Sequence, residues 1–137
     1  MDVPEHFQAL EPPSPFSELV GPLYINTSEP VPVLGVRVRG EHANQRGRAH
    51  GGLLMTLADI AVSRAARAQV PAGAVFATAD LHISFLEGVS EGQWLEAVPR
   101  LDRLGRSLIH ASCEIRCAEH LAARVLATIA VRLPVPD

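Results

Sequence analysis

The sequence predicts one α+β domain in which a single antiparallel sheet packs against one long helix. Three observations lead to this fold class. Residues 53–67 combine a dense apolar composition with polar side chains at a helical period, whereas the segments after them alternate with the period of a strand. Helix and strands are therefore segregated along the chain, which is typical of the α+β class. A chain of 137 residues is long enough to bury one core of its own.

The part of the chain before the helix is rich in proline. Residues 1–18 contain four prolines, and we expect them to form an irregular arm without regular elements, outside a domain that spans residues 19–137. Residues 19–24 are apolar but include a proline, which favours an edge strand or a strand and turn. Residues 33–39 alternate between apolar and polar side chains and predict a further strand.

Four strands are predicted after the helix. Residues 78–85 alternate strictly, so Thr78 and His82 are expected to share one polar face of a half-buried strand. The other three strands are predicted at residues 94–101, 107–117 and 121–133, with turns at 104–106 and 118–120. These short turns favour antiparallel neighbours in one sheet.

The predicted helix is apolar on almost all sides, so we expect it to be buried. Its polar residues are spaced three, four and four apart and form one narrow stripe: Thr56, Asp59, Ser63 and Arg67. Asp59 is the only carboxylate between His42 and Val70. A lone acid in a buried helix is costly unless a neighbour satisfies it or a reaction uses it, so Asp59 is a candidate catalytic residue.

The start of the helix carries two consecutive glycines, Gly51 and Gly52. The backbone N–H groups of a first helical turn have no partners within the helix, and here no side chain covers them. Together with the positive end of the helix dipole, they suit a carbonyl oxygen that becomes negative during a reaction. Hydrolysis of an ester or a thioester would find its electrophilic assistance at this point.

The residues around this helix start resemble the signature of the hotdog-fold acyl-CoA thioesterases. The resemblance is to the group that includes the phenylacetate-pathway thioesterases and the mammalian mitochondrial acyl-CoA thioesterase, within the 4-hydroxybenzoyl-CoA thioesterase superfamily. The matching residues, with every spacing kept, are Asn44, Gly47, His50-Gly51-Gly52 and Asp59. The likeness extends over residues 19–133 and implies the same fold class, with the sheet wrapped around the central helix.

The resemblance implies a role for each of five residues. Asp59 would be the general base or the nucleophile toward the thioester carbonyl. Asn44 would donate its side-chain amide to the thioester oxygen beside the N–H of Gly51, and His50 would orient the site rather than act as a base. Thr78 corresponds to a Ser or Thr that positions the attacking water in the family.

Each of these residues also has a purely structural explanation. Asn44 suits a turn and His50 suits a helix N-terminus, so both could serve as local caps. Thr78 is a good strand former, and His82 on the same strand is more simply a structural histidine. An acid in the position of Asp59 could face solvent or pair with an arginine.

The charges argue against a nucleic-acid partner. The net charge is −3, there is no lysine, and the twelve arginines are scattered rather than clustered. Four arginines flank predicted turns near the proposed site and are candidates for the phosphates of coenzyme A, although a solvated charge is the favoured explanation for any one of them: Arg46, Arg48, Arg103 and Arg106.

The remaining composition predicts no cofactor other than the coenzyme A of the substrate. Cys113 and Cys117 lie four apart in a predicted strand, beyond disulfide reach, and are expected to be reduced and structural. Neither they nor the six histidines show the spacing of a metal site. No signal peptide or membrane-spanning segment is predicted, so we expect a cytoplasmic protein.

We therefore expect a thioesterase that hydrolyses a small or medium acyl-CoA, aliphatic or aromatic. A single sheet around one helix leaves a sheet edge and the polar stripe uncovered, which predicts a homodimer or a dimer of dimers. An acyl-CoA-binding or sensing module without turnover is the main alternative. A hotdog hydratase or dehydratase is a third, but the sequence lacks the arrangement of Asp and His that the resemblance to those enzymes would require.

Overall fold

The computed structural model describes residues 2–118 and 120–135 and confirms the α+β fold. Its elements, in chain order, are β1 (Gln8–Ala9), α1 (Pro15–Val20), β2 (Tyr24–Asn26), β3 (Val33–Arg37), the 3₁₀ turn η1 (Gly40–His42), α2 (Gly51–Gln69), β4 (Val75–Phe85), β5 (Trp94–Leu104), β6 (Leu108–Cys117) and β7 (His120–Arg132). Glu119, at the centre of a predicted turn, lies outside the described residues.

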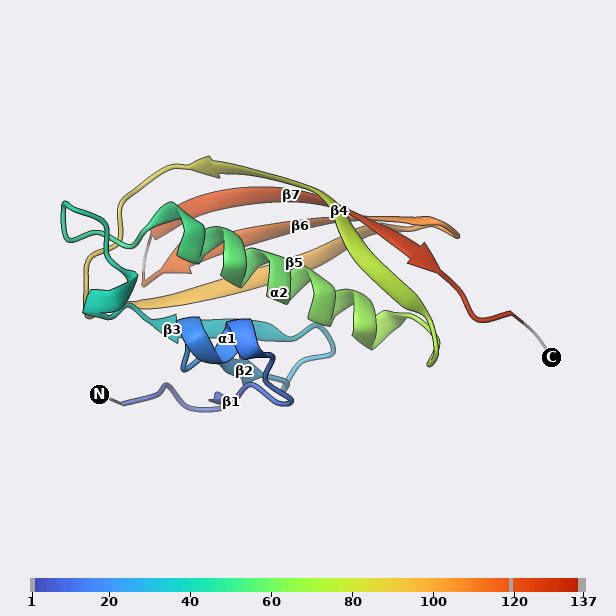
Figure 1. Ribbon diagram of the computed structural model, residues 1–137, viewed down its shortest axis with the longest axis horizontal. Helices are drawn as coiled ribbons and strands as arrows, with labels where there is room; N and C mark the ends of the chain where they lie inside the picture. The colour runs from blue at the N-terminus through green and yellow to red at the C-terminus, as the bar shows by residue number, and fades with distance from the viewer. Residues whose placement is uncertain (1, 119, 136–137) are drawn as a thin grey trace.

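All strands belong to one antiparallel, seven-stranded sheet in the order β1-β2-β3-β5-β6-β7-β4. The sheet curves around α2, which runs along its concave face (Figure 1). The chain crosses the sheet between β3 and β4, so that β4 lies at one edge beside β7 and its eleven residues have a neighbour on one side only. This is the hotdog arrangement that the resemblance implied.

The long helix α2 begins and ends where the sequence indicates. It starts at Gly51 and its last residue is Gln69, two residues before Pro71. One face is buried against the sheet and consists of Leu53, Leu54, Leu57, Ala58, Ala61, Val62, Ala65 and Ala66. The predicted burial holds for this face, whereas the polar stripe with Thr56, Asp59 and Ser63 is only half-buried in a single chain.

The N-terminal segment is more regular than its prolines suggest. Ser14 caps α1: its hydroxyl oxygen accepts a hydrogen bond from Ser17 N–H, and the hydroxyl oxygen of Ser17 accepts one from Ser14 N–H. Pro15 occupies the first turn, where a missing N–H costs nothing. The arm without regular elements is therefore a wrong prediction. A strand at residues 19–24 is wrong as well, since α1 extends to Val20 and β2 begins at Tyr24.

A β-bulge in β4 changes which side chains share a face. Thr78 pairs with Ile129 and Asp80 pairs with Thr128, so that Ala79 has no opposite residue. Side chains of directly opposed residues lie on the same face, and Ile129 is fully buried toward the helix. Thr78 therefore faces α2, while His82, opposite the exposed Leu126, faces outward. The prediction that Thr78 and His82 share a face is wrong, because the extra residue inverts the alternation.

Candidate active site

A short loop before α2 positions Asn44. The Asn44 N–H donates to the carbonyl of Arg48, at 2.7 Å, and Gly47 turns the chain with a φ of +75°. The Asn44 Oδ1 accepts hydrogen bonds from the backbone N–H groups of Arg46, at 2.9 Å, and Arg48, at 3.1 Å. Two donors facing one atom identify it as the oxygen. The NH₂ group of Asn44 has no partner among the described residues and remains free to donate elsewhere.

The first turn of α2 leaves one backbone donor open. His50 is the N-cap, and its Nδ1 accepts a hydrogen bond of 2.8 Å from Gly52 N–H. Its structural role as a cap is thereby established, and an accepting Nδ1 is a neutral ring nitrogen. The Leu53 N–H donates to the His50 carbonyl. The N–H of Gly51, the first residue of the helix, makes no hydrogen bond to any other described residue. This is expected of a donor in a first helical turn, which remains available to a ligand.

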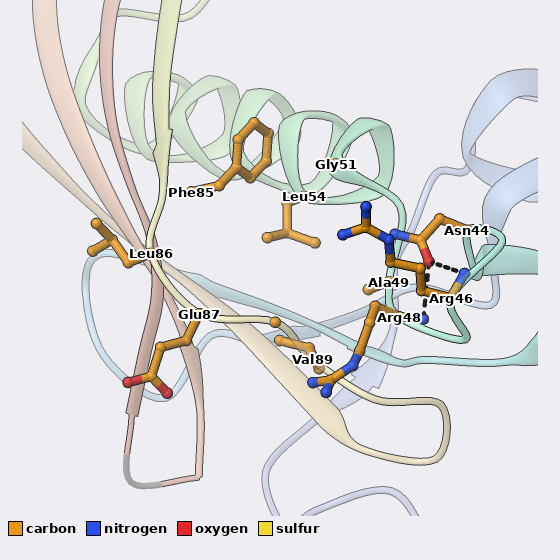
Figure 2. Close-up of a pocket in the computed structure, with 11 residues that line it drawn as sticks. Asn44, Arg46, Arg48, Ala49, Gly51, Leu54, Phe85, Leu86, Glu87 and Val89 are labelled. Atoms are coloured by element: carbon orange, nitrogen blue, oxygen red, sulfur yellow. Dashed lines mark hydrogen bonds between the residues drawn. The ribbon is translucent and has the colours of Figure 1, made fainter.

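Asn44 and Gly51 line one pocket of about 460 Å³. Its other lining residues come from the loop before α2, from α2 itself and from the end of β4 with the turn after it: Arg46, Arg48, Ala49, Leu54, Phe85, Leu86, Glu87, Gly88 and Val89. Figure 2 shows Leu54 and Phe85 on one side of this pocket and the two arginines on the other. The pocket is thus apolar at one end and cationic at the other.

The absence of a side chain at Gly51 keeps this pocket open. A Cβ there would lie 2.9 Å from Cζ of Phe85, a distance below ordinary van der Waals contact. Phe85 is 55% exposed, so its ring can move aside without disturbing the core. A side chain at Gly51 would therefore occupy the approach to the free N–H rather than break the fold.

The four candidate arginines do not converge in one chain. Arg46 and Arg48 line the pocket, and neither forms an ion pair among the described residues. Arg103 and Arg106 lie instead at the β5–β6 hairpin, beside the part of β7 that pairs with the start of β4. Phe85 is at the other end of β4, roughly 25 Å away along the strand. The prediction that all four flank one site is wrong within a single chain.

Asp59 is held by the strand beside its helix. The Thr78 hydroxyl donates a 2.5 Å hydrogen bond to Oδ1 of Asp59, linking α2 to β4. The bulge at Ala79 turns the Thr78 side chain toward the helix and so makes this contact possible. A hydroxyl donor fixes the orientation of the carboxylate and leaves its second oxygen for a water or a substrate.

Asp59 does not reach Gly51 in the same chain. The two residues are eight positions apart on one helix, or about 12 Å along its axis. Asp59 lines a different pocket, of about 210 Å³, between α2 and the N-terminal segment. One chain therefore presents two half-sites: a set of donors around Gly51, and an acid held by Thr78.

Several lining residues carry no signal in the sequence. Phe85 and Leu86 line the first pocket because β4 ends beside the start of α2, a proximity that strand alternation does not encode. Leu10 and Ser17 line the second because the N-terminal segment folds back onto α2. The Ser14-Pro15 pair was a usable signal for α1, since Ser followed by Pro often opens a helix.

The fold is that of the hotdog class, and comparison with known proteins gives the family. The model of the "Thioesterase superfamily" matches residues 46–123, which include Gly51, Asp59 and Thr78. The chain belongs to this superfamily.

Individual relatives agree with this membership. The chain is 36% identical to a Pseudomonas aeruginosa protein named "Putative esterase PA0474" over 124 residues, which cover 90% of this chain and 92% of that protein. A solved mutant of the phenylacetic acid degradation protein PaaI from Thermus thermophilus is 26% identical with a TM-score of 0.77, covering 88% of this chain and 100% of that one. The BH2602 protein from Bacillus halodurans, solved with CoA, shares the fold at 21% identity and a TM-score of 0.69, covering 72% and 66% of the two chains.

Proposed function

We propose that this protein hydrolyses a small or medium acyl-CoA, aliphatic or aromatic, to the free acid and coenzyme A. The observation that carries the proposal is a set of groups that line one pocket and have no partner among the described residues: the Gly51 N–H, the Asn44 NH₂ group and two arginines. A thioester needs a donor for its carbonyl oxygen, and coenzyme A needs cations for its phosphates. Arg46 and Arg48 would serve the phosphates.

The chemistry follows from what each half-site offers. The carbonyl oxygen accepts hydrogen bonds from Gly51 N–H and Asn44 NH₂, which strengthen as the oxygen becomes negative. Asp59 takes a proton from a water as that water attacks the carbonyl carbon. The tetrahedral intermediate collapses with cleavage of the C–S bond, the departing sulfur takes the proton held by Asp59 and leaves as the thiol of coenzyme A, and the acyl group is released as the free acid. Thr78 keeps the carboxylate aligned throughout, through its 2.5 Å hydrogen bond.

The two half-sites meet, in our proposal, between two subunits. The separation of about 12 Å along α2 prevents Gly51 from acting with Asp59 of its own chain. Two copies joined along the open edge of β4 would extend the sheet and place their helices side by side in opposite directions, which brings the start of one α2 near the middle of the other. We propose a cytoplasmic homodimer or dimer of dimers as the active form.

A hydrolysis screen tests the proposed function. Purified protein is incubated with acyl-CoA thioesters from acetyl to decanoyl and with phenylacetyl- and benzoyl-CoA, and the released thiol is followed over time. We expect turnover of at least one of them, lowered at least about 10²-fold in Asp59→Asn. Binding of acyl-CoA by calorimetry without release of thiol from any substrate would instead favour the sensing module.

A further inference from the structure

The pocket that contains Asp59 has the N-terminal segment as one wall. Leu10, Pro12, Ser14 and Ser17 line it on one side, and α2 lines it on the other with Asp59, Ile60, Ser63 and Arg64. In Figure 1, α1 lies alongside α2 and in front of β2 and β3. The N-terminal segment is therefore part of the surroundings of the acid.

This wall is fixed at both of its ends. Arg64 on α2 donates hydrogen bonds to the carbonyl oxygens of Glu11, at 2.9 Å, and Pro12, at 3.3 Å. At the end of α1, the buried His42 accepts at Nδ1 from the backbone and donates from Nε2 to the carbonyl of Val20, at 2.6 Å. The Arg39 guanidinium also donates to the carbonyl of Gly21. The wall is held against the body by three side chains from two other parts of the chain, namely α2 and the turn at residues 39–42.

Most polar groups of this wall already have partners within the protein. Ser14 and Ser17 bond each other reciprocally in the capping box, and the Ser17 hydroxyl also donates to the Ser14 carbonyl at 3.0 Å. The Arg64 guanidinium is engaged with two carbonyls. What the wall offers to a ligand is therefore its carbon surface, chiefly Leu10 and Pro12, facing Ile60 of α2. Such a surface favours the binding of an apolar group, because a charged or polar group buried against it would lose its hydrogen bonds to water without replacement.

We propose that this pocket receives the acyl group of the substrate and that the N-terminal segment, through Leu10, sets the length of acyl chain that is hydrolysed. The inference rests on the proposed function and adds the residues that determine its specificity. At about 210 Å³ the pocket is smaller than the roughly 300–1,000 Å³ typical of sites for drug-sized ligands. It suits a short or medium hydrocarbon group, while the coenzyme A portion lies outside it.

The first test enlarges the pocket on the side of the N-terminal segment. Leu10→Ala is compared with Leu23→Ala, a matched control: both leucines belong to the core cluster, are 7% and 6% exposed, and are joined by the Leu10 N–H to Leu23 carbonyl bond. Leu23 does not line the Asp59 pocket. We expect the ratio of kcat/KM for decanoyl-CoA to that for butanoyl-CoA to rise about tenfold or more in Leu10→Ala only, because an apolar pocket discriminates by roughly that factor per carbon or two.

The second test fills the pocket from the α2 side. Ser63→Leu should lower the same ratio about tenfold, and Ala68→Leu, on the exposed last turn of the same helix, should leave it unchanged. A loss of folded enzyme lowers kcat/KM for both substrates by the same factor, so the ratio of the two values does not change. The inference is overturned if Leu10→Ala and Leu23→Ala have the same ratio, or if Ser63→Leu has the ratio of the wild type. The proposed hydrolysis of acyl-CoA is unaffected by either result. If the wild type hydrolyses no acyl-CoA, the proposed function itself fails.

Discussion

Asp59 carries the proposed proton transfer, and its surroundings offer one hydroxyl donor and no arginine partner among the described residues. Asp59→Asn keeps the size and the hydrogen bond to Thr78 but cannot accept a proton. We expect hydrolysis to fall by at least about 10²-fold, the range that general base catalysis supplies, while acyl-CoA affinity is retained. Released thiol and calorimetric affinity are measured on the same preparation. Hydrolysis at the wild-type rate would mean that Asp59 is structural here.

Gly51 tests the electrophilic side of the site. Gly51→Val places methyl groups over the free N–H and against the Phe85 ring, whose exposure lets it move. We expect kcat to fall about 10²- to 10³-fold, the effect of losing one oxyanion donor, with an unfolding temperature close to that of the wild type. The control is Gly73→Val, at a glycine with φ of +89° outside the pocket, which should lose stability rather than turnover of the folded enzyme. Unchanged kinetics in Gly51→Val would exclude this N–H from the site.

Cys113 and Cys117 are both free and buried. Burial, and then the charge of Glu114, raises the pKa of the Cys113 thiol to about 12, and burial raises that of Cys117 as well. At pH 8 the folded protein should therefore present protonated, covered thiols that react slowly with a disulfide reagent, and both should react at once in denaturant. Because an unfolded thiol ionises near its usual pKa and Cys113 does not, stability should fall as the pH rises above about 9. Rapid labelling of the native protein would contradict this.

At the scale of elements, Thr78 connects β4 to α2, and its role depends on the bulge beside it. Thr78→Val keeps the shape of the strand but removes the hydroxyl that holds Asp59. We expect kcat to fall about tenfold with little change in KM, since the base is misaligned rather than lost. Thr78→Ser, which keeps the donor, should restore most of kcat, and Thr128→Val on the outward face should change nothing. Equal losses in the Val and Ser variants would point to packing instead.

The elements also show what the sequence could and could not predict. The extent of α2 and the positions of the strands after it along the chain followed from the periodicity of apolar residues. Burial of one face imposes the helical period on a helix and the period of two on a strand. The bulge in β4 could not be predicted in this way. The inserted residue leaves the alternation of side-chain types in the sequence unchanged, but it reverses which side chains face the helix on one side of the bulge. The helix α1 was obscured by neighbouring prolines, although its Ser14 cap was readable.

The site was predictable to a similar degree. The motif around Asn44, Gly51 and Asp59 predicted the groups that our proposal uses, and the structure places two of them, Asn44 and Gly51, in one pocket. The position of Arg103 was not predictable. A residue beside a turn in the sequence can lie at either end of the sheet, and the turn of the long β5–β6 hairpin lies at the end away from the pocket. Contacts between distant segments, such as that of Leu10 with the Asp59 pocket, depend on tertiary folding alone.

For the whole molecule, the open edge of β4 and the half-buried stripe on α2 are the two surfaces that the proposed second copy would cover. Several large apolar side chains along β4 and β7 are exposed in one chain, among them Val75 at 67% and Leu126 at 60%. Surfaces of this kind are typical of interfaces between subunits. No helix of the described residues is long and apolar enough to cross a membrane. We expect sedimentation to give at least a dimer, and a stable, active monomer would contradict the shared site.

The measurement that tests the central claim most directly is complementation between two inactive variants. Asp59→Asn and Gly51→Val are produced separately and then refolded together, so that half of the dimers contain one chain of each kind. If Gly51 of one subunit acts with Asp59 of the other, each mixed dimer regains one intact site, and the mixture should recover about a quarter of the wild-type rate of acyl-CoA hydrolysis. If each site lies within one chain, every site in the mixed dimer carries a lesion. No recovery from a mixture shown to contain mixed dimers would therefore contradict the account.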